Sequence, residues 1–296
     1  MNINKKNQFT FIGGDLRTVK LIEMLSKEEN IIYTFGLEKA EELKDKNNII
    51  FCLNLNEALD KSDIVICPIP FSSDGENLKA LYSEDKITIK SLSKLVSEKI
   101  VIAGNISANI VEEMTEVYKA KKVIDIMKNE ELTILNTIAT AEGTIATAIL
   151  NTDKILHDSE ILILGFGRVA KTLAKKLSNL STNVTCAVRK KEDIAWIVAD
   201  GYKYENINKI ENIEKYDIII NTVPTLILKD DDIKKVNKEC LIIDLASAPG
   251  GVDRQSIQKN NIKFIWALAL PGKVAPLTSA KFIKETINNI LKEIDK

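Results

Sequence analysis

Short apolar runs alternate along the whole chain with longer segments in which apolar residues recur at helical spacing. A continuous apolar run of about four to eight residues is typical of a buried parallel strand, and the longer spacing is typical of an amphipathic helix. Strands that alternate with helices in this way predict parallel sheets covered by helices. Two such sets lie on either side of an Ala- and Thr-rich segment at 136–150. The pattern therefore predicts an α/β protein with two doubly wound lobes.

The apolar runs give the positions of the expected elements in each lobe. In the first lobe the predicted strands are 8–13, 31–36, 49–53, 63–70 and 99–104, with helices at 16–25, 38–44, 77–82 and 110–118. In the second lobe the predicted strands are 160–164, 183–188, 202–204, 217–223, 240–247 and 263–270. About six parallel strands are the number that a complete dinucleotide-binding domain contains.

Two long helices are expected to connect the lobes. The segment 136–150 carries few charges, and a helix that is apolar on nearly every side is buried, here as a spine between the lobes. The amphipathic segment 276–294 is expected to return and pack on the first lobe. This organisation predicts a substrate domain at 1–135 plus 276–296 and a cofactor domain at 136–275, with a ligand cleft between them.

A glycine-rich turn follows the first strand of the second lobe. Gly165, Gly167 and Ala170 form the pattern Gly-x-Gly-x-x-Ala between an apolar run and a helical segment. Gly165 permits a tight turn, Gly167 lets the backbone approach a pyrophosphate, and the helix amino terminus offers free N–H groups. This context predicts a Rossmann-like dinucleotide site, with a purely structural turn as the alternative. The predicted contacts in the loop are Gly165, Phe166, Gly167, Arg168 and Val169.

The next strand of this lobe ends in Arg189, and no Asp or Glu stands there to bind a ribose 2′-hydroxyl. A cationic strand end suits a 2′-phosphate, so the predicted cofactor is NADP, and a solvated Arg189 is the alternative. Further cofactor contacts are expected where later strands of the lobe end. They are Asn221, Thr222, Val223, Pro224, Ser247 and Lys273.

The first lobe carries Gly13-Gly14-Asp15-Leu16-Arg17 after its first strand. This turn predicts a second anion site at a helix amino terminus, but it lacks the full fingerprint of a dinucleotide site. Arg17 offers a planar fork for a substrate carboxylate, although a loop cap is the alternative for any one residue of this rim. The predicted substrate contacts are Gly14, Asp15, Arg17, Ser72, Ser73, Asn105, Ser107 and Thr140.

Few side chains are candidates for proton transfer. His157 is the only histidine, and it precedes a strand, at the end of the sheet where ligands do not bind. Glu142 is an acidic residue on an otherwise apolar helix and is the predicted catalytic residue, with a hydrogen-bonded helix residue as the alternative. No spacing of His, Cys or Asp indicates a metal.

Composition narrows the function classes. The chain has 296 residues and a formal net charge of −1, which argues against a nucleic-acid surface or a basic membrane patch. The first six residues contain no apolar core of a signal peptide, and no apolar stretch is expected to span a membrane. The cysteines form no Cys-x-x-Cys pair, which is typical of a reducing cytoplasm.

Five motifs in a fixed order extend over essentially the whole chain. They are Gly13-Gly14-Asp15-x-Arg17, Asn136-Thr-Ile-x-Thr140-x-Glu142-Gly143-Thr144, Gly165-x-Gly167-Arg168, Asp244-Leu-Ala-Ser247-x-Pro-Gly-Gly251-x-Asp253 and Leu270-Pro-Gly-x-Val-Ala-Pro276. With these motifs the chain resembles the family of dipicolinate synthase A subunits and, more distantly, alanine dehydrogenase and its two-lobed relatives. Ala139 departs from the pattern, where a proline is expected.

The resemblance implies the last step of dipicolinic acid formation in sporulation, at a branch from lysine biosynthesis. A hydroxy-tetrahydrodipicolinate would lose water and be oxidised to pyridine-2,6-dicarboxylate, with NADP accepting the hydride. The resemblance also implies a location in the mother-cell cytoplasm and a partner, the flavoprotein-like B subunit of dipicolinate synthase. Self-association is expected as well. The alternatives are an oxidoreductase of the alanine dehydrogenase type that acts on an amino or imino acid, and a non-catalytic NADP-binding regulatory subunit.

Overall fold

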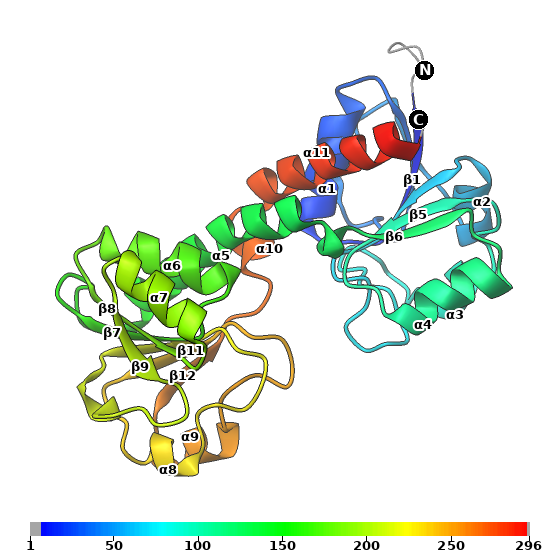
Figure 1. The fold of residues 1–296 in the computed structure, drawn as a ribbon. Helices are drawn as coiled ribbons and strands as arrows, with labels where there is room; N and C mark the ends of the chain where they lie inside the picture. The colour runs from blue at the N-terminus through cyan, green and yellow to red at the C-terminus, as the bar shows by residue number, and fades with distance from the viewer. Residues whose placement is uncertain (1–6, 295–296) are drawn as a thin grey trace. The chain divides into compact units, whose positions relative to one another are not determined.

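The computed structural model describes residues 7–294 and divides the chain into two compact units. Unit 1 comprises Met1–Leu135 and Ala275–Lys296, and unit 2 comprises Asn136–Val274. Each unit is built around its own six-stranded parallel sheet (Figure 1). The predicted α/β fold with two Rossmann-like lobes is thus confirmed. Residues 1–6, on which the expected lack of a signal peptide depends, lie outside the described residues.

The sheet of unit 1 has the strand order β3-β2-β1-β4-β5-β6. Its strands are β1 (Gln8–Ile12), β2 (Ile31–Phe35), β3 (Ile49–Phe51), β4 (Ile64–Ile66), β5 (Ile100–Ala103) and β6 (Lys122–Asp125). The order reverses between β1 and β4, and ligands of such sheets bind at the carboxyl ends of the strands beside this point. The apolar runs do not predict β6, because this edge strand begins with a lysine and is only partly buried.

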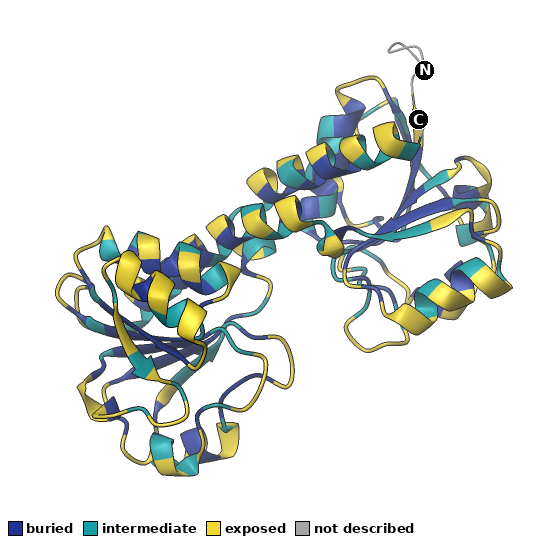
Figure 2. Ribbon diagram, in the orientation of Figure 1, coloured by how far each residue is buried: buried dark blue, intermediate teal, exposed yellow. Residues whose placement is uncertain are grey.

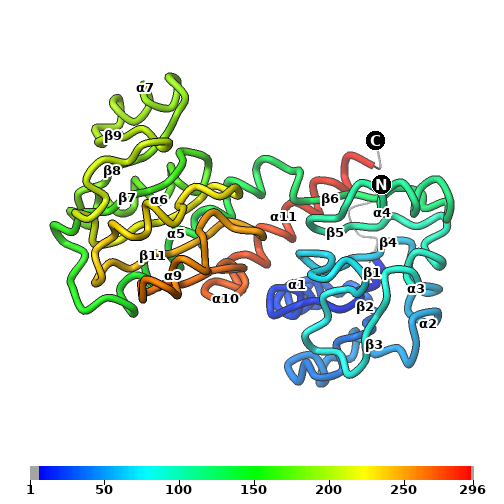
Figure 3. Tube along the Cα trace, turned by 90° about the horizontal axis from the view of Figure 1, so that it is seen from below, coloured from blue at the N-terminus to red at the C-terminus, as the bar shows by residue number. Residues whose placement is uncertain are grey.

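Helices of unit 1 pack against both faces of its sheet. They are α1 (Leu16–Ser26), α2 (Leu55–Asp60), α3 (Ile89–Ser93), α4 (Ala108–Glu112), which continues as a π-helical turn at Glu113–Val117, and α11 (Pro276–Ile294). The last helix, α11, lies alongside α1 (Figures 1 and 3), and its Ile283 and Ile287 share a core cluster with Val19 and Ile22. The expected return of the last helix to the first lobe is therefore confirmed.

Two helices predicted in the first lobe are wrong. The segment 38–44 forms only a 3-10 turn at Glu41–Leu43, and the segment 77–82 makes isolated β-bridges followed by a turn. In the second case the backbone makes long-range bonds instead of helical ones. Gly14 N donates to Lys79 O at 2.9 Å, and Leu81 N donates to Gly14 O at 3.0 Å. These bonds hold the segment 77–82 across the carboxyl end of β1.

The sheet of unit 2 has the order β12-β11-β10-β7-β8-β9, with the same reversal of direction beside its first strand. Its strands are β7 (Glu160–Leu164), β8 (Asn183–Val188), β9 (Lys203–Asn206), β10 (Ile218–Asn221), β11 (Leu241–Asp244) and β12 (Lys263–Trp266). Its helices are α6 (Arg168–Ser178), α7 (Lys191–Ala199), α8 (Asp230–Ile233), α9 (Arg254–Asn260) and α10 (Leu270–Val274). Residues of β7, β8, β10 and β11 are mostly buried, whereas the edge strands β9 and β12 and the outer faces of the helices are more exposed (Figure 2).

The long helix α5 (Glu130–Asn151) begins in unit 1 and ends in unit 2. Leu132 belongs to a core cluster of unit 1, and Ala141 and Ala148 belong to one of unit 2. Among the described residues, α5 is the one helix that is long and apolar enough to cross a membrane by length and composition. A helix that packs in the core of a folded protein meets the same criterion. The packing of α5 in two cores gives a physical reason for so apolar a helix.

Candidate functional site

The glycine loop of unit 2 begins where β7 ends. Gly165 adopts a φ of +95°, and a Cβ at this position would lie 2.8 Å from Thr222 Oγ1 and from a methyl group of Val223. Its N–H donates to Ala187 O at 2.9 Å, which ties the turn to β8. Thr222 Oγ1 in turn donates to Leu164 O at 2.8 Å. Only glycine fits this turn, because a side chain meets both steric and conformational obstacles.

Gly167 differs from Gly165, because nothing in the fold requires a glycine at position 167. It is the N-cap of α6 with a φ of −78°, which any residue adopts, and a Cβ there would meet no atom within 4 Å. Phe166 is buried under the loop, and no acidic residue lies in the first turn of α6. Open space in front of a helix amino terminus without nearby acid is what an anionic pyrophosphate requires. The loop therefore fits a dinucleotide.

The carboxyl end of β8 is cationic at its surface. Arg189 and Lys190 are exposed directly after the strand, and Lys190 is the N-cap of α7. The nearest acidic residues in sequence, Glu192 and Asp193, lie in the first turn of α7 rather than at the strand end. A 2′-phosphate would find charge of the opposite sign at this position, whereas a ribose hydroxyl would find no carboxylate acceptor from the strand end.

A buried pair joins the ends of β10 and β11. Asn221 and Asp244 are almost completely buried, and Asn221 Nδ2 donates to Asp244 Oδ1 at 2.7 Å. Asp244 also accepts from the backbone N–H groups of Ala246 at 2.9 Å and Gly251 at 2.8 Å. The carboxylate thus fixes the loop that follows β11, and the amide links it to β10. The sequence indicates Asn221 as a strand-end residue and Asp244 as part of a motif, but it does not indicate that the two form a pair.

Other predicted cofactor residues have less defined surroundings. Val223 N donates to Asn221 Oδ1 at 3.1 Å, so the loop after β10 is held by the same pair. Val169 is half-buried in the first turn of α6. Exposed residues on this side of unit 2 include Arg168, Pro224, Ser247 and Lys273. Within residues 7–294 no group of three or more His, Cys, Asp or Glu side chains could hold a metal ion.

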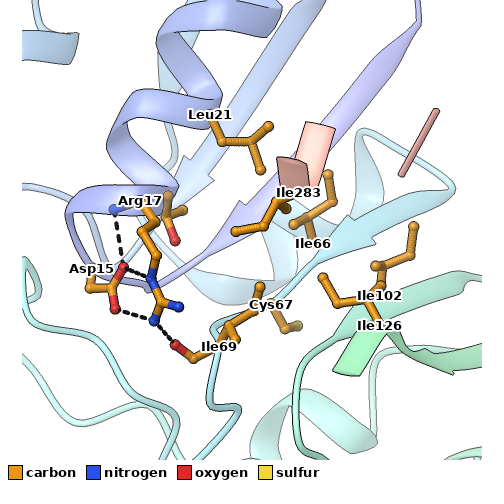
Figure 4. A pocket seen from close by; sticks show the side chains of 10 residues that line it. Asp15, Arg17, Leu21, Ile66, Cys67, Ile69, Ile102, Ile126 and Ile283 are labelled. Carbon is orange, nitrogen blue, oxygen red and sulfur yellow. Dashed lines mark hydrogen bonds and ion pairs between the residues drawn. The ribbon is translucent and has the colours of Figure 1, made fainter. Parts of the chain in front are cut away.

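A cluster of three charges lies at the end of β1 in unit 1. Arg17 is buried and pairs with Asp15 through two bonds, Nε to Oδ1 at 3.0 Å and Nη2 to Oδ2 at 2.7 Å. Its Nη2 also donates to the carbonyl oxygen of Ile69 (Figure 4). Lys79 Nζ lies 3.0 Å from Asp15 Oδ2. One carboxylate and two cations give this Asp15–Arg17–Lys79 cluster a net positive charge.

The charges also set the protonation of the cluster. Burial of Asp15 disfavours its ionised form, but hydrogen bonds and attraction from Arg17 and Lys79 outweigh burial and lower the pKa of this carboxyl. Apolar side chains such as Leu21, Ile102 and Ile283 border the pocket behind the guanidinium (Figure 4). Asp15 therefore stays ionised at neutral pH and can pair with both cations at once.

The backbone of this turn does not form the anion site that the sequence predicts. Gly14 N donates to Lys79 O, and Arg17 N donates to Asp15 Oδ1 at 3.1 Å. A Cβ at Gly13 would lie 2.9 Å from Ala80 Cβ, so the segment 77–82 fills the place where a dinucleotide loop would be open. An anion at this turn could therefore be bound only by side chains. Lys79 is the residue that the sequence did not indicate, because its segment was expected to be a separate helix.

The remaining predicted substrate residues lie at other strand ends and on α5. Ser72 Oγ bonds within its own turn to Asp74 at 3.1 Å, and Ser73 is exposed. Asn105 N donates to Asp125 Oδ1 at 2.8 Å, and Ser107 is the N-cap of α4. Thr140 Oγ1 donates to Asn136 O at 2.9 Å along α5. The contacts of Ser72 and Thr140 lie within four residues of each, whereas the Asn105–Asp125 bond joins the ends of β5 and β6.

Glu142 lies on an exposed part of α5. Its Oε1 lies 2.8 Å from Nζ of Lys176, in the last turn of α6. The glycine loop is at the other end of α6, about 12 Å away along the helix at its rise per residue. This geometry gives Glu142 an ion-pair partner and no contact with the glycine loop, so it provides no support for the predicted catalytic role.

Two family models match the chain, one in each unit. Residues 8–127 match the N-terminal domain of the dipicolinate synthase A subunit, and residues 144–266 match the shikimate / quinate 5-dehydrogenase family. The A subunit of dipicolinate synthase from Bacillus subtilis (strain 168) is 30% identical over 287 residues, which cover 96% of this chain and 95% of that relative. The chain belongs to the family of dipicolinate synthase A subunits. The dehydrogenase match identifies unit 2 as a dehydrogenase-type domain.

Solved structures give the same result. The A subunit of dipicolinate synthase from Bacillus halodurans has a TM-score of 0.86 at 27% identity and covers 96% of this chain and 97% of its own. The A chain from Bacillus subtilis has a TM-score of 0.84 at 28% identity, with 98% and 97% covered. A transhydrogenase from Sinorhizobium meliloti, at 13% identity and a TM-score of 0.65, covers 97% and 94% and shares the fold alone. The dehydrogenase match supports an oxidoreductase with a nicotinamide nucleotide cofactor.

We predict that Gly167→Val removes nicotinamide nucleotide binding without unfolding the protein. The new side chain enters open space in the apo fold, but it occupies the volume that a pyrophosphate needs. Titration by cofactor fluorescence should show an affinity loss of about 100-fold or more, equivalent to about 2.8 kcal/mol. Lys175→Val, near the opposite end of α6, is the matched control and should bind normally. Normal affinity in a folded Gly167→Val protein would make the loop a structural turn.

A second prediction concerns the Asn221–Asp244 pair. Asp244→Asn replaces an acceptor of three N–H donors by an amide, and hydrogen bonds to charged groups are worth about 1.5–3 kcal/mol. Affinity for NADP should fall about tenfold, whereas affinity for 2′,5′-ADP, which lacks the nicotinamide half, should not change. The exchange Asn221→Asp with Asp244→Asn should recover part of the loss. An equal loss for both ligands would contradict the assignment of these loops to the nicotinamide side.

Proposed function

We propose that this protein is an NADP-dependent oxidoreductase that forms dipicolinate, acting as the A subunit of a dipicolinate synthase. The observation that carries the proposal is the open glycine loop at Gly167 in a dehydrogenase-type unit, within a chain of the A-subunit family. The cationic end of β8 at Arg189 supports NADP over NAD. The positive Asp15–Arg17–Lys79 cluster supports an anionic substrate.

The proposed reaction balances with the substrate and one cofactor. Hydroxy-tetrahydrodipicolinate loses water to give a dihydropyridine dicarboxylate. Loss of one hydride and one proton then yields pyridine-2,6-dicarboxylate, and NADP, when bound, accepts the hydride to become NADPH. Aromatisation of the ring favours the oxidation, so the protein needs above all to orient the donor carbon and to hold the carboxylates.

Residues of unit 2 would hold the cofactor. The N–H groups at the start of α6 would bind the pyrophosphate in front of Gly167, and Arg189 would bind the 2′-phosphate. The loops after β10 and β11 follow the fourth and fifth strands of a Rossmann-like order, where the nicotinamide half of a dinucleotide is expected. The buried Asn221–Asp244 pair keeps these loops in one conformation.

Residues of unit 1 would hold the substrate. Asp15 neutralises one of the two cations, so the cluster retains one positive charge, which matches one carboxylate. Asp15 and the carbonyl of Ile69 fix the guanidinium of Arg17, while Lys79 carries a rotatable ammonium on a flexible stem. Hydroxyl and amide groups at Ser72, Ser73, Asn105 and Ser107 are candidates for the second carboxylate. A flavoprotein-like B subunit as partner, self-association and the mother-cell cytoplasm belong to the same proposal.

The decisive experiment mixes the purified protein with NADP and freshly prepared hydroxy-tetrahydrodipicolinate, with and without the purified B subunit. NADPH and pyridine-dicarboxylate absorbance should rise together in equal amounts. Turnover only with pyruvate, ammonia and reduced cofactor would indicate an amino-acid oxidoreductase instead. Cofactor binding without turnover in any mixture would indicate a regulatory subunit.

The substrate side predicts a specific kinetic effect of Lys79→Met. Loss of the ammonium should raise KM for the dicarboxylate by about tenfold or more, in line with about 1.5–3 kcal/mol for a charged hydrogen bond. The dissociation constant of NADP should stay unchanged, because the cluster belongs to unit 1. Lys86→Met, an exposed lysine of the same unit, is the matched control and should leave both constants unaltered. A normal KM in a stable Lys79→Met protein would exclude this cluster from the substrate site.

The cofactor side predicts a change of preference in Arg189→Asp. The carboxylate would repel a 2′-phosphate and accept a bond from a ribose hydroxyl. The ratio of NADP to NAD affinities, measured by fluorescence titration, should fall at least tenfold, which is about 1.4 kcal/mol. Lys203 is exposed at the amino end of β9, whereas Arg189 follows the carboxyl end of the neighbouring strand β8. Lys203→Asp therefore serves as the charge control. An unchanged ratio would remove Arg189 from the site.

A further inference from the structure

Arg254 lies at the carboxyl end of the sheet of unit 2 and takes no part in the site described above. It is the first residue of α9, and its guanidinium carbon lies 4.4 Å from the centre of the Trp266 ring. Trp266 is the last residue of β12, in register with Asp244 at the end of β11. The Arg254–Trp266 pair therefore lies beside the loop that follows β11.

This loop holds the indole in place. Trp266 Nε1 donates to Ala246 O at 2.8 Å, and the side chain is partly buried. A Cβ at Gly250 would lie 3.9 Å from the ring atom Cε2, so the backbone of the loop passes close to the ring. Asp244 in turn fixes the loop through the N–H groups of Ala246 and Gly251. The indole is thus a fixed surface on which a guanidinium can rest in one place.

No acidic side chain among the described residues pairs with the guanidinium of Arg254. The residue is exposed, and the contact of its side chain is the one with the Trp266 ring. The neighbouring carboxylate of Asp253 is used elsewhere. Its Oδ1 accepts from the N–H groups of Gln255 and Ser256, and its Oδ2 accepts from Ser256 Oγ. The N–H donors of Arg254 are therefore available to a ligand.

A positioned guanidinium with available donors is suited to a carboxylate. Its planar fork offers parallel N–H donors to the two carboxylate oxygens, and it keeps its charge at any physiological pH. The position is also suitable, because the loop after β11 follows the fifth strand of a Rossmann-like order. The nicotinamide half of a dinucleotide is expected there. An anion bound by Arg254 would thus lie beside the place where hydride transfer is expected.

We propose that Arg254 binds one carboxylate of the dicarboxylate substrate and that Trp266 positions the guanidinium for this contact. The inference rests on the proposed function, which supplies both the dicarboxylate and the nicotinamide cofactor. Asp253 has a defined part in it, since this residue caps α9 and so fixes the helix turn that carries Arg254. Unit 2 then contacts the substrate directly through a side chain.

Tryptophan fluorescence tests the assignment at the proposed place, because the chain has two tryptophans and one of them is Trp266. In a Trp196→Phe protein, the tryptophan emission comes from Trp266. Pyridine-2,6-dicarboxylate, added at saturating NADP, should change this emission saturably, since the ligand neutralises the charge over the ring. Arg254→Gln in the same background should raise the dissociation constant of the dicarboxylate, measured by calorimetry, about tenfold or more. The dissociation constant of NADP should not change.

A second ligand shows whether Arg254 meets a carboxylate. The Trp196→Phe protein should prefer pyridine-2,6-dicarboxylate to pyridine-2-carboxylate, and Arg254→Gln should abolish this preference, because one of the two carboxylate contacts is then lost. Arg254→Lys should recover part of the preference, since lysine keeps the charge but not the planar fork. Lys259→Gln removes an exposed cation in the last turn of α9. It is the matched control and should bind both ligands normally.

Several outcomes would overturn the inference. They are a dicarboxylate that does not bind the Trp196→Phe protein, an unchanged dissociation constant in a folded Arg254→Gln protein, and an equal loss of NADP affinity, which would assign Arg254 to the cofactor.

Kinetics separate this inference from the proposed function. Turnover of hydroxy-tetrahydrodipicolinate by Arg254→Gln with an unaltered KM would overturn the inference and leave the proposed function intact. Dicarboxylate binding that depends on Arg254, in a wild type without turnover in any mixture, would support the inference and overturn the proposed function.

Discussion

Helices cover both faces of a parallel sheet, so the backbone polar groups at the carboxyl ends of its strands must still find partners. This side of the sheet is its carboxyl edge. The two units have the same strand order and solve this problem differently. In unit 1 the chain supplies the partners, because Lys79 O accepts from Gly14 N and Leu81 N donates back to Gly14 O. In unit 2 the edge stays open in front of Gly167. One fold thus gives one edge that is closed to a dinucleotide and one edge that fits it.

The closed edge of unit 1 has its own chemical consequence. The segment that closes it also carries Lys79 to Asp15, 64 positions away in the sequence, so the same contact fills a loop and creates a cationic cluster. Arg17 is held rigidly by Asp15 and by a backbone carbonyl. Because the pKa of Asp15 is lowered, the stability that this carboxylate contributes is present at neutral pH and is lost only as acid protonates it. The cluster therefore keeps its charge across the neutral range.

The sequence predicted those features of the structure for which a single residue type has a single physical cause. Continuous apolar runs located eleven strands, but β6 escaped because an edge strand needs no such run. Gly165 and Gly167 could be found because a tight turn and a close backbone approach both demand glycine. Lys79 could not be found, and neither could the pairing of Asn221 with Asp244, since each depends on a contact between segments far apart in the chain. Local sequence patterns predict helices and strands well, whereas a binding site depends on which loops meet in the folded chain.

Glu142 shows how the same residue changes meaning once its surroundings are known. A carboxylate on an apolar helix suggests proton transfer, but its ion pair with Lys176 lies at the wrong end of α6 for the glycine loop. A partly exposed ion pair of this kind contributes little stability, because water competes for both charges. What the pair does supply is a contact that joins α5 to the last turn of α6. In the folded chain, Glu142 is therefore accounted for by its pairing with Lys176, and nothing in the geometry requires a role in proton transfer.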